Sequence, residues 1–340
     1  MYKLELAVWE ITSKCNLNCV HCINESGDFS LPEEFSTHEG LILIEQLADL
    51  GCKDIVLSGG EPFIRNDWVI LSQKIISLGM GLHIMTNGTL LDDDDFDILR
   101  NLEVSSLSFS LDGANPETHD YIRGKQGAFD KLTSNIKKAV KNNLSVSVST
   151  TVTKKNLDEL EKIVNLSIKS GVPLHQIQLG KLQGRMPENL VLNEKEYYSL
   201  AEQIVKLRKK YSKKINIVEA DCIGYYSKLS SELEIKTWKG CQCGINIVCI
   251  NSSGEVKGCP HNQNSEGNIK HLPLKEIWND YNKFAYNRRF SRENLKGYCR
   301  KCKYGDLCRG GCSANTCSSK GTDKETPYCL WKIETYGYSD

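Results

Sequence analysis

Apolar and β-branched residues recur in six short runs along the first two thirds of the chain. Between these runs lie longer segments in which apolar positions repeat with helical periodicity, and several begin with a capping residue or end at glycine. Ser36 and Glu39 have the spacing of a capping box, as do Asn193 and Glu196. The pattern predicts strands at 4–11, 54–58, 82–86, 104–111, 144–152 and 174–179. It predicts helices at 37–50, 66–78, 92–100, 128–142, 157–170 and 192–214.

The alternation of strands and helices predicts six parallel strands joined by right-handed crossovers. Such strands form either an α/β barrel or a doubly wound sheet, and the pattern does not choose between them. In both folds, ligands bind at the carboxyl ends of the strands. The residues at those ends are polar and rich in turn formers, which suits a binding site and also fits loop geometry alone. They are residues 58–62, 86–88, 110–113 and 180–181.

The pattern changes after the lysine-rich helix at 192–214. From about residue 239 onward the chain has more glycine, asparagine and cysteine, and one further helix is predicted at 274–288. We expect a second, loop-rich domain whose core is held by metal rather than by aliphatic packing. The predicted organisation is an α/β domain at 1–215, a bridging region at 216–238 and this small domain at 239–340.

The balance of charge excludes several classes of partner. The 340-residue chain carries 43 basic and 43 acidic side chains, so its net charge favours neither nucleic acid nor an anionic membrane. Its apolar runs are too short to span a bilayer, and the N-terminus lacks the apolar core of a signal peptide. We therefore predict a cytoplasmic protein with no nucleic-acid partner and no membrane partner.

Fifteen cysteines are the unusual feature of the composition. Thiols at this frequency in a reducing compartment indicate metal ligands or nucleophiles rather than disulfides. Cys15, Cys19 and Cys22 cluster near the start, and eleven cysteines lie between Cys222 and Cys329, beyond a long cysteine-free middle. This distribution predicts two separate metal-binding regions.

The spacing of the first three cysteines suits an iron–sulfur cluster. A structural zinc site takes four protein ligands, and no fourth cysteine or well-placed histidine lies nearby. His21 is within the motif, but its position beside Cys22 makes it an awkward ligand for the same metal. Three thiolates on a tight loop suit a [4Fe–4S] cube with one iron left open to a substrate or cofactor.

The segment Cys15-Asn16-Leu17-Asn18-Cys19-Val20-His21-Cys22, followed by Gly59-Gly60-Glu61-Pro62, resembles the radical S-adenosylmethionine (SAM) superfamily. His21 occupies the aromatic position of that motif. The resemblance implies a partial (β/α)6 barrel, in agreement with the six strand–helix units. It implies that SAM chelates the open iron and that the Gly-Gly-Glu-Pro loop contacts the SAM amino group. It also places the SAM ribose and methionyl group along Thr86, Asn87, Ser110 and Arg123.

The C-terminal cysteines resemble the SPASM extension of that superfamily. The signature runs Gly254-x4-Cys259, then Cys299-x2-Cys302-x5-Cys308-x3-Cys312, then Cys329. The resemblance implies two auxiliary [4Fe–4S] clusters, which makes three clusters in all. It assigns Cys243, Cys249, Cys259 and Cys312 to the first auxiliary cluster, and Cys299, Cys302, Cys308 and Cys329 to the second.

Two alternatives stay open for these cysteines. Cys241 competes with Cys243, because both lie at a permissible distance before Gly254. The four cysteines from 299 to 312 also have the spacing of a zinc ribbon, although the N-terminal motif favours iron–sulfur. Cys52, at a helix end, fits buried packing, and Cys222 and Cys317 receive no role.

The resemblance predicts an oxidoreductase that works by radical chemistry. One electron from the reduced cluster would cleave SAM to methionine and a 5′-deoxyadenosyl radical, which abstracts hydrogen from an unactivated C–H bond. The auxiliary clusters would accept an electron from the substrate or coordinate it, and a flavodoxin- or ferredoxin-like protein is the expected electron donor. No catalytic acid or base is assigned; His119 and His261 are the candidates.

SPASM enzymes mostly act on peptides, so the resemblance predicts a thioether or carbon–carbon cross-link, or an epimerisation, in a ribosomally made peptide. Only fourteen residues precede Cys15, so leader binding is expected from a separate protein or by direct recognition. Maturation of a sulfatase to formylglycine is an alternative, but Pro260 stands where those enzymes carry aspartate. Oxidation of a small molecule or tetrapyrrole is another alternative, and a non-enzymatic iron–sulfur or zinc module is the remote one.

Overall fold

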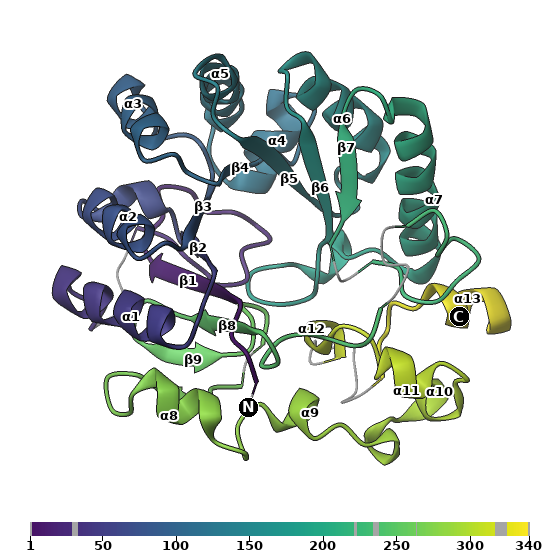
Figure 1. Ribbon diagram of the computed structural model, residues 1–340. Helices are drawn as coiled ribbons and strands as arrows, with labels where there is room; N and C mark the ends of the chain where they lie inside the picture. Colours follow the sequence, from purple (N-terminus) through teal and green to yellow (C-terminus); the bar gives the residue numbers. More distant parts are fainter. Residues whose placement is uncertain are drawn as a thin grey trace.

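The computed structural model describes residues 2–28, 33–220, 223–233, 238–262, 264–316 and 325–338. Its centre is a ten-stranded sheet with the order β10-β9-β8-β1-β2-β3-β4-β5-β6-β7. Strands β1 to β7 are parallel, and each pairs with the next in sequence, with helices on the outside of the curved sheet (Figure 1). A doubly wound sheet would reverse its strand order at a switch point. The sequential order therefore identifies a partial barrel.

The predicted strands and helices of the barrel are all present, with ends that differ by a few residues. The parallel strands are β1 (Leu6–Thr12), β2 (Asp54–Gly59), β3 (Gly81–Thr86), β4 (Ser106–Ser110), β5 (Val146–Val152), β6 (Leu174–Leu179) and β7 (Asn216–Glu219). The helices are α1 (Thr37–Asp49), α2 (Trp68–Ser77), α3 (Asp93–Asn101), α4 (Pro116–Arg123), α5 (Ala128–Lys141), α6 (Leu160–Lys169) and α7 (Glu194–Tyr211). Short 3-10 turns are η1 (Pro62–Ile64), η2 (Leu157–Glu159) and η3 (Glu188–Leu190).

Helix α4 is the element of the barrel that hydrophobic periodicity does not predict, because its sequence is mostly polar. Its ends nevertheless carry ordinary signals. The Asn115 side chain caps it by accepting a hydrogen bond from the Thr118 N–H, Pro116 opens it, and Gly124 ends it at a φ of 66°. The helix matters because it carries Arg123 at its last position, beside the carboxyl ends of the strands.

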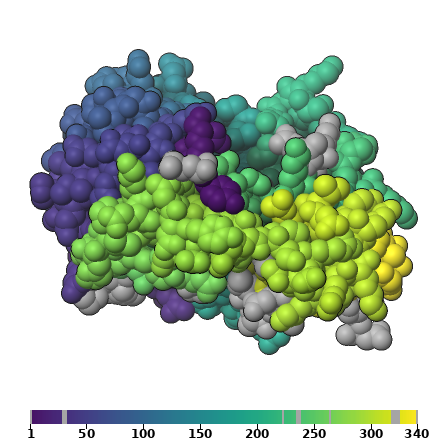
Figure 2. Space-filling model, turned by 60° about the horizontal axis from the view of Figure 1, so that its bottom comes forward, coloured from purple at the N-terminus to yellow at the C-terminus, as the bar shows by residue number. Residues whose placement is uncertain are grey.

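The C-terminal region continues the sheet of the barrel. Strand β8 (Ile247–Ile250) pairs in parallel with β1, and β9 (Glu255–Lys257) and β10 (Gly267–Asn268) extend it as antiparallel strands. The region spreads over one face of the molecule (Figure 2). Its helices are α8 (Leu274–Asn279), α9 (Ala285–Arg288), η4 (Arg292–Asn294), α10 (Gly297–Lys301), α11 (Gly305–Cys308), α12 (Ser313–Thr316) and α13 (Leu330–Tyr336).

Two expectations for this half of the chain need correction. The single helix predicted at 274–288 is broken into α8 and α9, because Phe284 adopts a left-handed φ of 54° in the connection. Strand β7 lies within the predicted bridging region, yet it pairs with β6 as a seventh parallel strand. Among the described helices, none is both long and apolar enough to cross a membrane.

Glycines allow the loop after β2 to pack backbone against backbone on the segment after β1. The Gly60 N–H donates to the Thr12 carbonyl at 2.7 Å, and the Glu61 N–H donates to the Lys14 carbonyl at 2.8 Å. A Cβ on Gly60 would lie 2.0 Å from the Lys14 carbonyl oxygen, and one on Gly59, whose φ is 128°, would lie 2.3 Å from that of Thr12. This approach of the two loops therefore requires glycine at both positions.

Replacement of Gly60 by alanine is expected to lower the free energy of unfolding by about 3 kcal/mol, because the backbone must move to admit the methyl group. Gly51→Ala is the control, since Gly51 has a φ of 78° but nothing lies within 4 Å of its added Cβ. The control should cost roughly 1 kcal/mol of left-handed strain. Urea denaturation of both variants measures the difference, and equal losses would contradict the close-approach argument.

His175 on β6 is fully buried in the barrel wall. Its ring nitrogens lie 2.8 Å from Thr150 Oγ1 and 3.1 Å from Ser167 Oγ. Burial lowers the pKa of His175 to about 4, against an opposing contribution from Asp112. The folded chain therefore binds this proton less readily than the unfolded chain does.

This histidine should make the fold sensitive to acid. The pKa of this histidine is 6.5 in the unfolded chain and about 4 in the folded chain. The stability that comes from burying the neutral ring is therefore fully present above pH 6.5 and is lost as the pH falls toward 4. About 2 kcal/mol should be lost by pH 5. Urea unfolding at pH 7.5 and pH 5 tests this against His175→Gln, which has no titrating ring. A variant with the same pH dependence as the parent chain would refute it.

Candidate active site

A cavity of about 560 Å³ opens where the parallel strands end. Most residues predicted to bind SAM or its cluster line this cavity, although they come from five separate segments. They are Cys15, Cys19, His21, Cys22, Gly59, Gly60, Thr86, Asn87, Ser110 and Arg123. The wall also includes Cys241, Cys243, Cys259 and Cys312 from the C-terminal region. One cavity thus joins the two cysteine-rich parts of the sequence.

The first three cysteines lie in an environment that suits metal-bound thiolates. Cys15 and Cys19 are buried and Cys22 is half-buried. Asn87 Nδ2 donates to Cys15 Sγ at 3.9 Å, and Arg123 Nη1 donates to Cys19 Sγ at 3.8 Å. Burial raises the pKa of Cys15 to about 12 and also raises that of Cys19, so ionisation of these thiols requires a nearby positive group. Iron supplies such a charge, and the two N–H···S contacts are of the kind that support cluster ligands.

Asp112, in the turn after β4, connects the cysteine motif to helix α4. One of its carboxylate oxygens lies 2.8 Å from His21 Nε2 and 2.6 Å from Arg123 Nη2, and the other accepts the Thr151 N–H at 2.8 Å. Burial alone would raise the pKa of Asp112, but Arg123 and His21 hold it well below its usual range. This carboxylate is therefore ionised and fixes the Arg123 guanidinium and the His21 ring.

Sequence analysis did not assign Asp112 to the site. The available signal was its place in the polar turn 110–113 at a strand end, where a carboxylate in a buried position needs a cationic partner. Its partners could not be identified because His21 is 91 positions away and Arg123 lies on the helix that periodicity missed.

Two buried nitrogens of these residues have no hydrogen-bond partner among the described residues. They are His21 Nδ1 and Arg123 Nε. Because buried polar atoms normally form hydrogen bonds, each indicates space for a polar group that the chain itself does not provide. Both residues line the cavity, so a bound SAM molecule, with its amino, carboxylate and hydroxyl groups, fits this part of the wall.

The Gly-Gly-Glu-Pro loop divides into two parts. Gly59 and Gly60 line the cavity, whereas Glu61 and Pro62 are not among its lining residues. The Glu61 carboxylate accepts hydrogen bonds from Thr86 Oγ1 and from the Asn87 N–H, both at 2.7 Å. Burial raises the pKa of Glu61 to about 7 in spite of these donors. Glu61 therefore ties the end of β2 to the end of β3, and its contact with SAM remains a prediction.

The predicted ligands of the first auxiliary cluster lie close together. The Cys243 thiol contacts the thiols of both Cys241 and Cys259, and Cys312 packs in the same cluster of side chains. Cys249 is buried on β8 and close enough to Cys259 for a thiolate there to raise its pKa further. Cys241 contacts Cys243 and also lines the cavity, so the choice between these two cysteines stays open.

The predicted ligands of the second auxiliary cluster also form one group. Burial raises the pKa of Cys308, and Cys329, Cys299 and Cys302 add to that rise in this order. Burial likewise raises the pKa of Cys329 to about 12, with contributions from Cys299 and Cys302. The Tyr304 N–H donates to Cys302 Sγ at 3.4 Å. The four thiols, three of them on buried cysteines and that of Cys308 on a half-buried one, are thus neighbours, as a cube with four protein ligands requires.

The zinc-ribbon alternative places four thiolates around one ion. Among the residues that the structure describes, no three His, Cys, Asp or Glu side chains surround a single-ion position. A [4Fe–4S] cube takes one thiolate per iron, so its ligands stand around a larger group.

Cys222 and Cys317 lie outside the described residues, and Cys52 is buried with its thiol 3.2 Å from the Asp54 carbonyl.

The two candidate acid–base histidines occupy different places. His119 is buried behind the site, where its Nδ1 accepts the Asp112 N–H at 3.2 Å, and burial lowers its pKa to about 4. It is not among the lining residues of the cavity. His261 does line the cavity, and burial lowers its pKa to about 3. Both imidazoles are therefore neutral at physiological pH.

Polar and cationic side chains after β6 complete the wall. Arg185 donates from Nε to the Cys19 carbonyl at 3.0 Å and from Nη2 to the Ser26 carbonyl at 2.8 Å, which braces the cysteine loop. Lys181 is buried, and its Nζ lies 3.9 Å from Cys312 Sγ. The lysine thus stands within the cavity wall beside the first auxiliary group.

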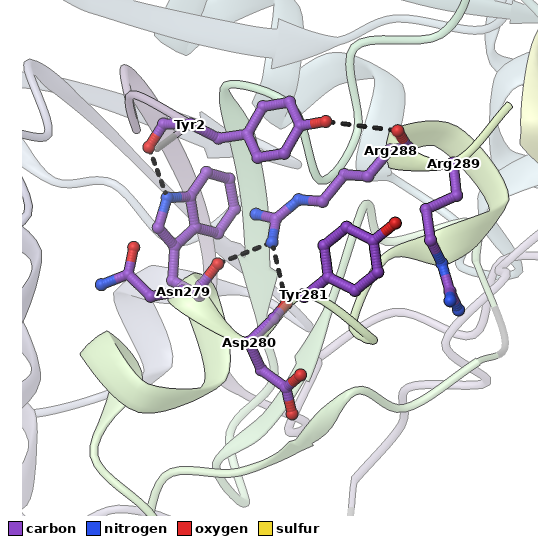
Figure 3. A pocket seen from close by; sticks show the side chains of 7 residues that line it. Tyr2, Asn279, Asp280, Tyr281, Arg288 and Arg289 are labelled. Atoms are coloured by element: carbon purple, nitrogen blue, oxygen red, sulfur yellow. Dashed lines mark hydrogen bonds between the residues drawn. The ribbon is translucent and has the colours of Figure 1, made fainter.

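A second, smaller cavity of about 330 Å³ contains none of the predicted site residues. Figure 3 shows Arg288 at its centre, with hydrogen bonds to backbone carbonyl oxygens. The guanidinium carbon lies 4.5 Å from the ring centroids of Tyr2, Trp278 and Phe284. Arg288 therefore joins the N-terminus to the C-terminal region, which is a structural role.

Comparison with known proteins finds similarity along nearly the whole chain. The model of the radical SAM superfamily matches residues 9–167, and that of an iron–sulfur cluster-binding domain, SPASM, matches residues 241–303. The AdoMet-dependent heme synthase of Methanosarcina barkeri is 32% identical, over 96% of this chain and 96% of that protein. The Fe-coproporphyrin III synthase of the same organism is 31% identical, over 99% of this chain and 90% of its own.

Peptide-modifying proteins are also similar, at lower identity. The mycofactocin maturase of Mycolicibacterium smegmatis is 28% identical over 90% of this chain and 77% of its own. The crystal structure of Streptococcus suis SuiB bound to precursor peptide SuiA has a TM-score of 0.75 at 18% identity, over 95% of this chain and 75% of that chain. The structural likeness confirms the partial barrel with its C-terminal extension.

Proposed function

Because the chain belongs to the radical SAM superfamily and carries a SPASM domain, we propose that it uses SAM to oxidise an iron tetrapyrrole. The observation that carries this proposal is the similarity to a heme synthase along nearly the whole of both chains. The tetrapyrrole was an alternative at the level of the sequence, and the relatives at 31% and 32% identity support it better than a peptide.

The residues of the cavity have three proposed roles, which are to hold the cluster, to bind SAM and to position other side chains. When bound, a reduced [4Fe–4S] cluster with SAM would supply the radical chemistry that removes hydrogen from a substrate C–H bond. We propose that Cys15, Cys19 and Cys22 hold that cluster, while Gly59, Thr86, Ser110 and their neighbours in the wall bind SAM. Asp112 holds the His21 and Arg123 side chains in place beside the cluster ligands.

The rest of the wall suits a substrate with anionic side chains. Tetrapyrroles such as coproporphyrin carry carboxylates, which need cationic partners when they leave water. Lys181 and Arg185 are the lysine and arginine beside the auxiliary cysteines and the cysteine loop. A substrate bound there would lie between the first three cysteines and the first auxiliary group, so one group can start the reaction and the other can accept the second electron.

Anaerobic turnover of a chosen substrate tests the proposal. The reconstituted chain is incubated with SAM, dithionite and iron coproporphyrin III, and 5′-deoxyadenosine and the tetrapyrrole are quantified by mass spectrometry. We expect 5′-deoxyadenosine to increase with the tetrapyrrole and the tetrapyrrole mass to change in proportion. The same mixture without SAM is the control.

A ribosomal peptide is the second candidate, favoured by the 28% identity to a mycofactocin maturase. The distinguishing experiment co-expresses the short open reading frames beside the gene and examines each peptide for a mass change and for D-residues. An altered peptide together with an unchanged tetrapyrrole would refute the proposed function and support this candidate. A separate leader-binding protein belongs to the second candidate alone.

A further inference from the structure

His261 has a position in the cavity that the proposed function does not yet use. It follows two residues after Cys259 and lines the same cavity as Cys15, Cys19 and Cys22. Its backbone is held in place, because the His261 carbonyl accepts a hydrogen bond from Gln183 Nε2 at 3.3 Å. The backbone of His261 is therefore tied to the segment after β6, in a cavity wall that contains cysteines of both regions.

The imidazole has no hydrogen bond to any described residue, and its Nδ1 atom is buried without a partner. The other histidine in the cavity wall, His21, is bonded to Asp112. Nδ1 of His261 is buried, and the residue lines the cavity. Nε2 is therefore the nitrogen that a molecule in the cavity can reach. Nε2 has no hydrogen bond to a described residue and is not a buried atom, so it is open to a ligand in the cavity.

We propose that His261 Nε2 is an axial ligand of the iron of the tetrapyrrole substrate, an inference that rests on the proposed function. Neutral imidazole is a common nitrogen ligand of tetrapyrrole iron. The sulfurs of the nearby cysteines are assigned to clusters, and His261 is the histidine of the cavity wall whose ring is not bonded to another described side chain. Ligation of the iron would hold the macrocycle by its centre, while Lys181 stands close enough to bind a carboxylate at its edge.

Binding of ferric iron coproporphyrin III, measured without SAM or turnover, tests this ligand. The parent chain should give the absorption and electron paramagnetic resonance spectra of nitrogen-ligated iron. His261→Ala should lose that signature and bind with a Kd about tenfold higher or more. Added free imidazole should restore the spectrum of His261→Ala, which a purely structural role of the residue would not explain.

His38→Ala provides the matched control, because His38 is an exposed histidine on α1, outside the cavity, and its removal should leave the spectrum unchanged. Iron and sulfide content and circular dichroism establish that each variant is folded, and His261→Gln serves if the alanine variant is not. An unchanged spectrum in the folded His261 variant would overturn the inference but leave the tetrapyrrole function intact. Failure of the parent chain to bind iron coproporphyrin III or heme would instead reject the function itself.

Discussion

Alanine at Cys15, Cys19 and Cys22 is expected to abolish the formation of 5′-deoxyadenosine from SAM, with a loss of about 10⁴-fold or more. The reason is that these three thiols are the ligands assigned to the one cluster with an open iron. The iron content should fall from roughly twelve to roughly eight atoms per chain, because each cube holds four irons. Anaerobic assay by liquid chromatography and colorimetric iron analysis measure both effects.

The matched control for this variant is Cys52→Ala. Cys52 is buried and its thiol hydrogen-bonds to backbone carbonyls of residues 5 and 54, far from the cavity wall. We expect it to retain about twelve irons and nearly full SAM cleavage, since packing is its only visible role. Retention of 5′-deoxyadenosine formation by the triple variant would show that the cluster site has been misassigned.

Replacement of Asp112 by alanine should lower the free energy of unfolding of the apo-protein by about 3–5 kcal/mol. The change leaves the Arg123 guanidinium buried without its counter-charge, 2.6 Å from the place of the lost carboxylate, and it releases His21. SAM binding should weaken as well, because both partners line the cavity. Urea denaturation and equilibrium dialysis with SAM measure the two consequences.

Asp97→Ala is the control variant, because it removes a carboxylate from an ion pair with arginine that is exposed rather than buried. Asp97 and Arg100 form an exposed ion pair on α3 at 2.8 Å, so its loss should cost no more than about 0.5 kcal/mol. Adding Arg123→Met to the Asp112 variant should recover part of the stability, because the uncompensated charge is then removed. Equal effects of the Asp112 and Asp97 variants would contradict the role assigned to the buried carboxylate.

Much of the barrel could be predicted from the sequence because its strands are buried. Apolar residues fill most of the buried positions of these strands, which fall at every second residue in β3, β4 and β6, and this pattern marks β1 to β6 to within a few residues. Helix α4 lacks a strong apolar stripe, so only its end signals, Asn115, Pro116 and Gly124, could have revealed it. Strand β8 joins β1 across more than 200 residues, and no local pattern encodes such a pairing.

The candidate site was predictable where spacing alone determines the chemistry. The cysteine spacings placed Cys15, Cys19 and Cys22 together, and the structure brings Thr86, Asn87, Ser110 and Arg123 to the same cavity. Contacts between distant segments were not predictable, and Asp112 is the clearest example. Glu61 is a second example, since the motif does not indicate that its carboxylate also joins the ends of two strands.

The identity of the substrate is the property that the sequence motifs predicted least well. The cysteine signature is shared by enzymes that act on peptides and by enzymes that make iron tetrapyrroles, so it favoured the more numerous group. The substrate contacts that we propose are single side chains of the cavity wall, such as Lys181 and His261, which no sequence motif marks. Their place in the cavity is known only from the folded structure. The proposal of a tetrapyrrole also required comparison over the whole length of a relative.

Reductive cleavage of SAM by the reconstituted parent chain tests the central claim most directly. Under strict exclusion of oxygen, the protein with dithionite and SAM should release methionine and 5′-deoxyadenosine in equal amounts. The cysteine triple variant, treated in parallel, should release neither above background. Absence of 5′-deoxyadenosine from the parent chain after it has incorporated about twelve irons would contradict the account.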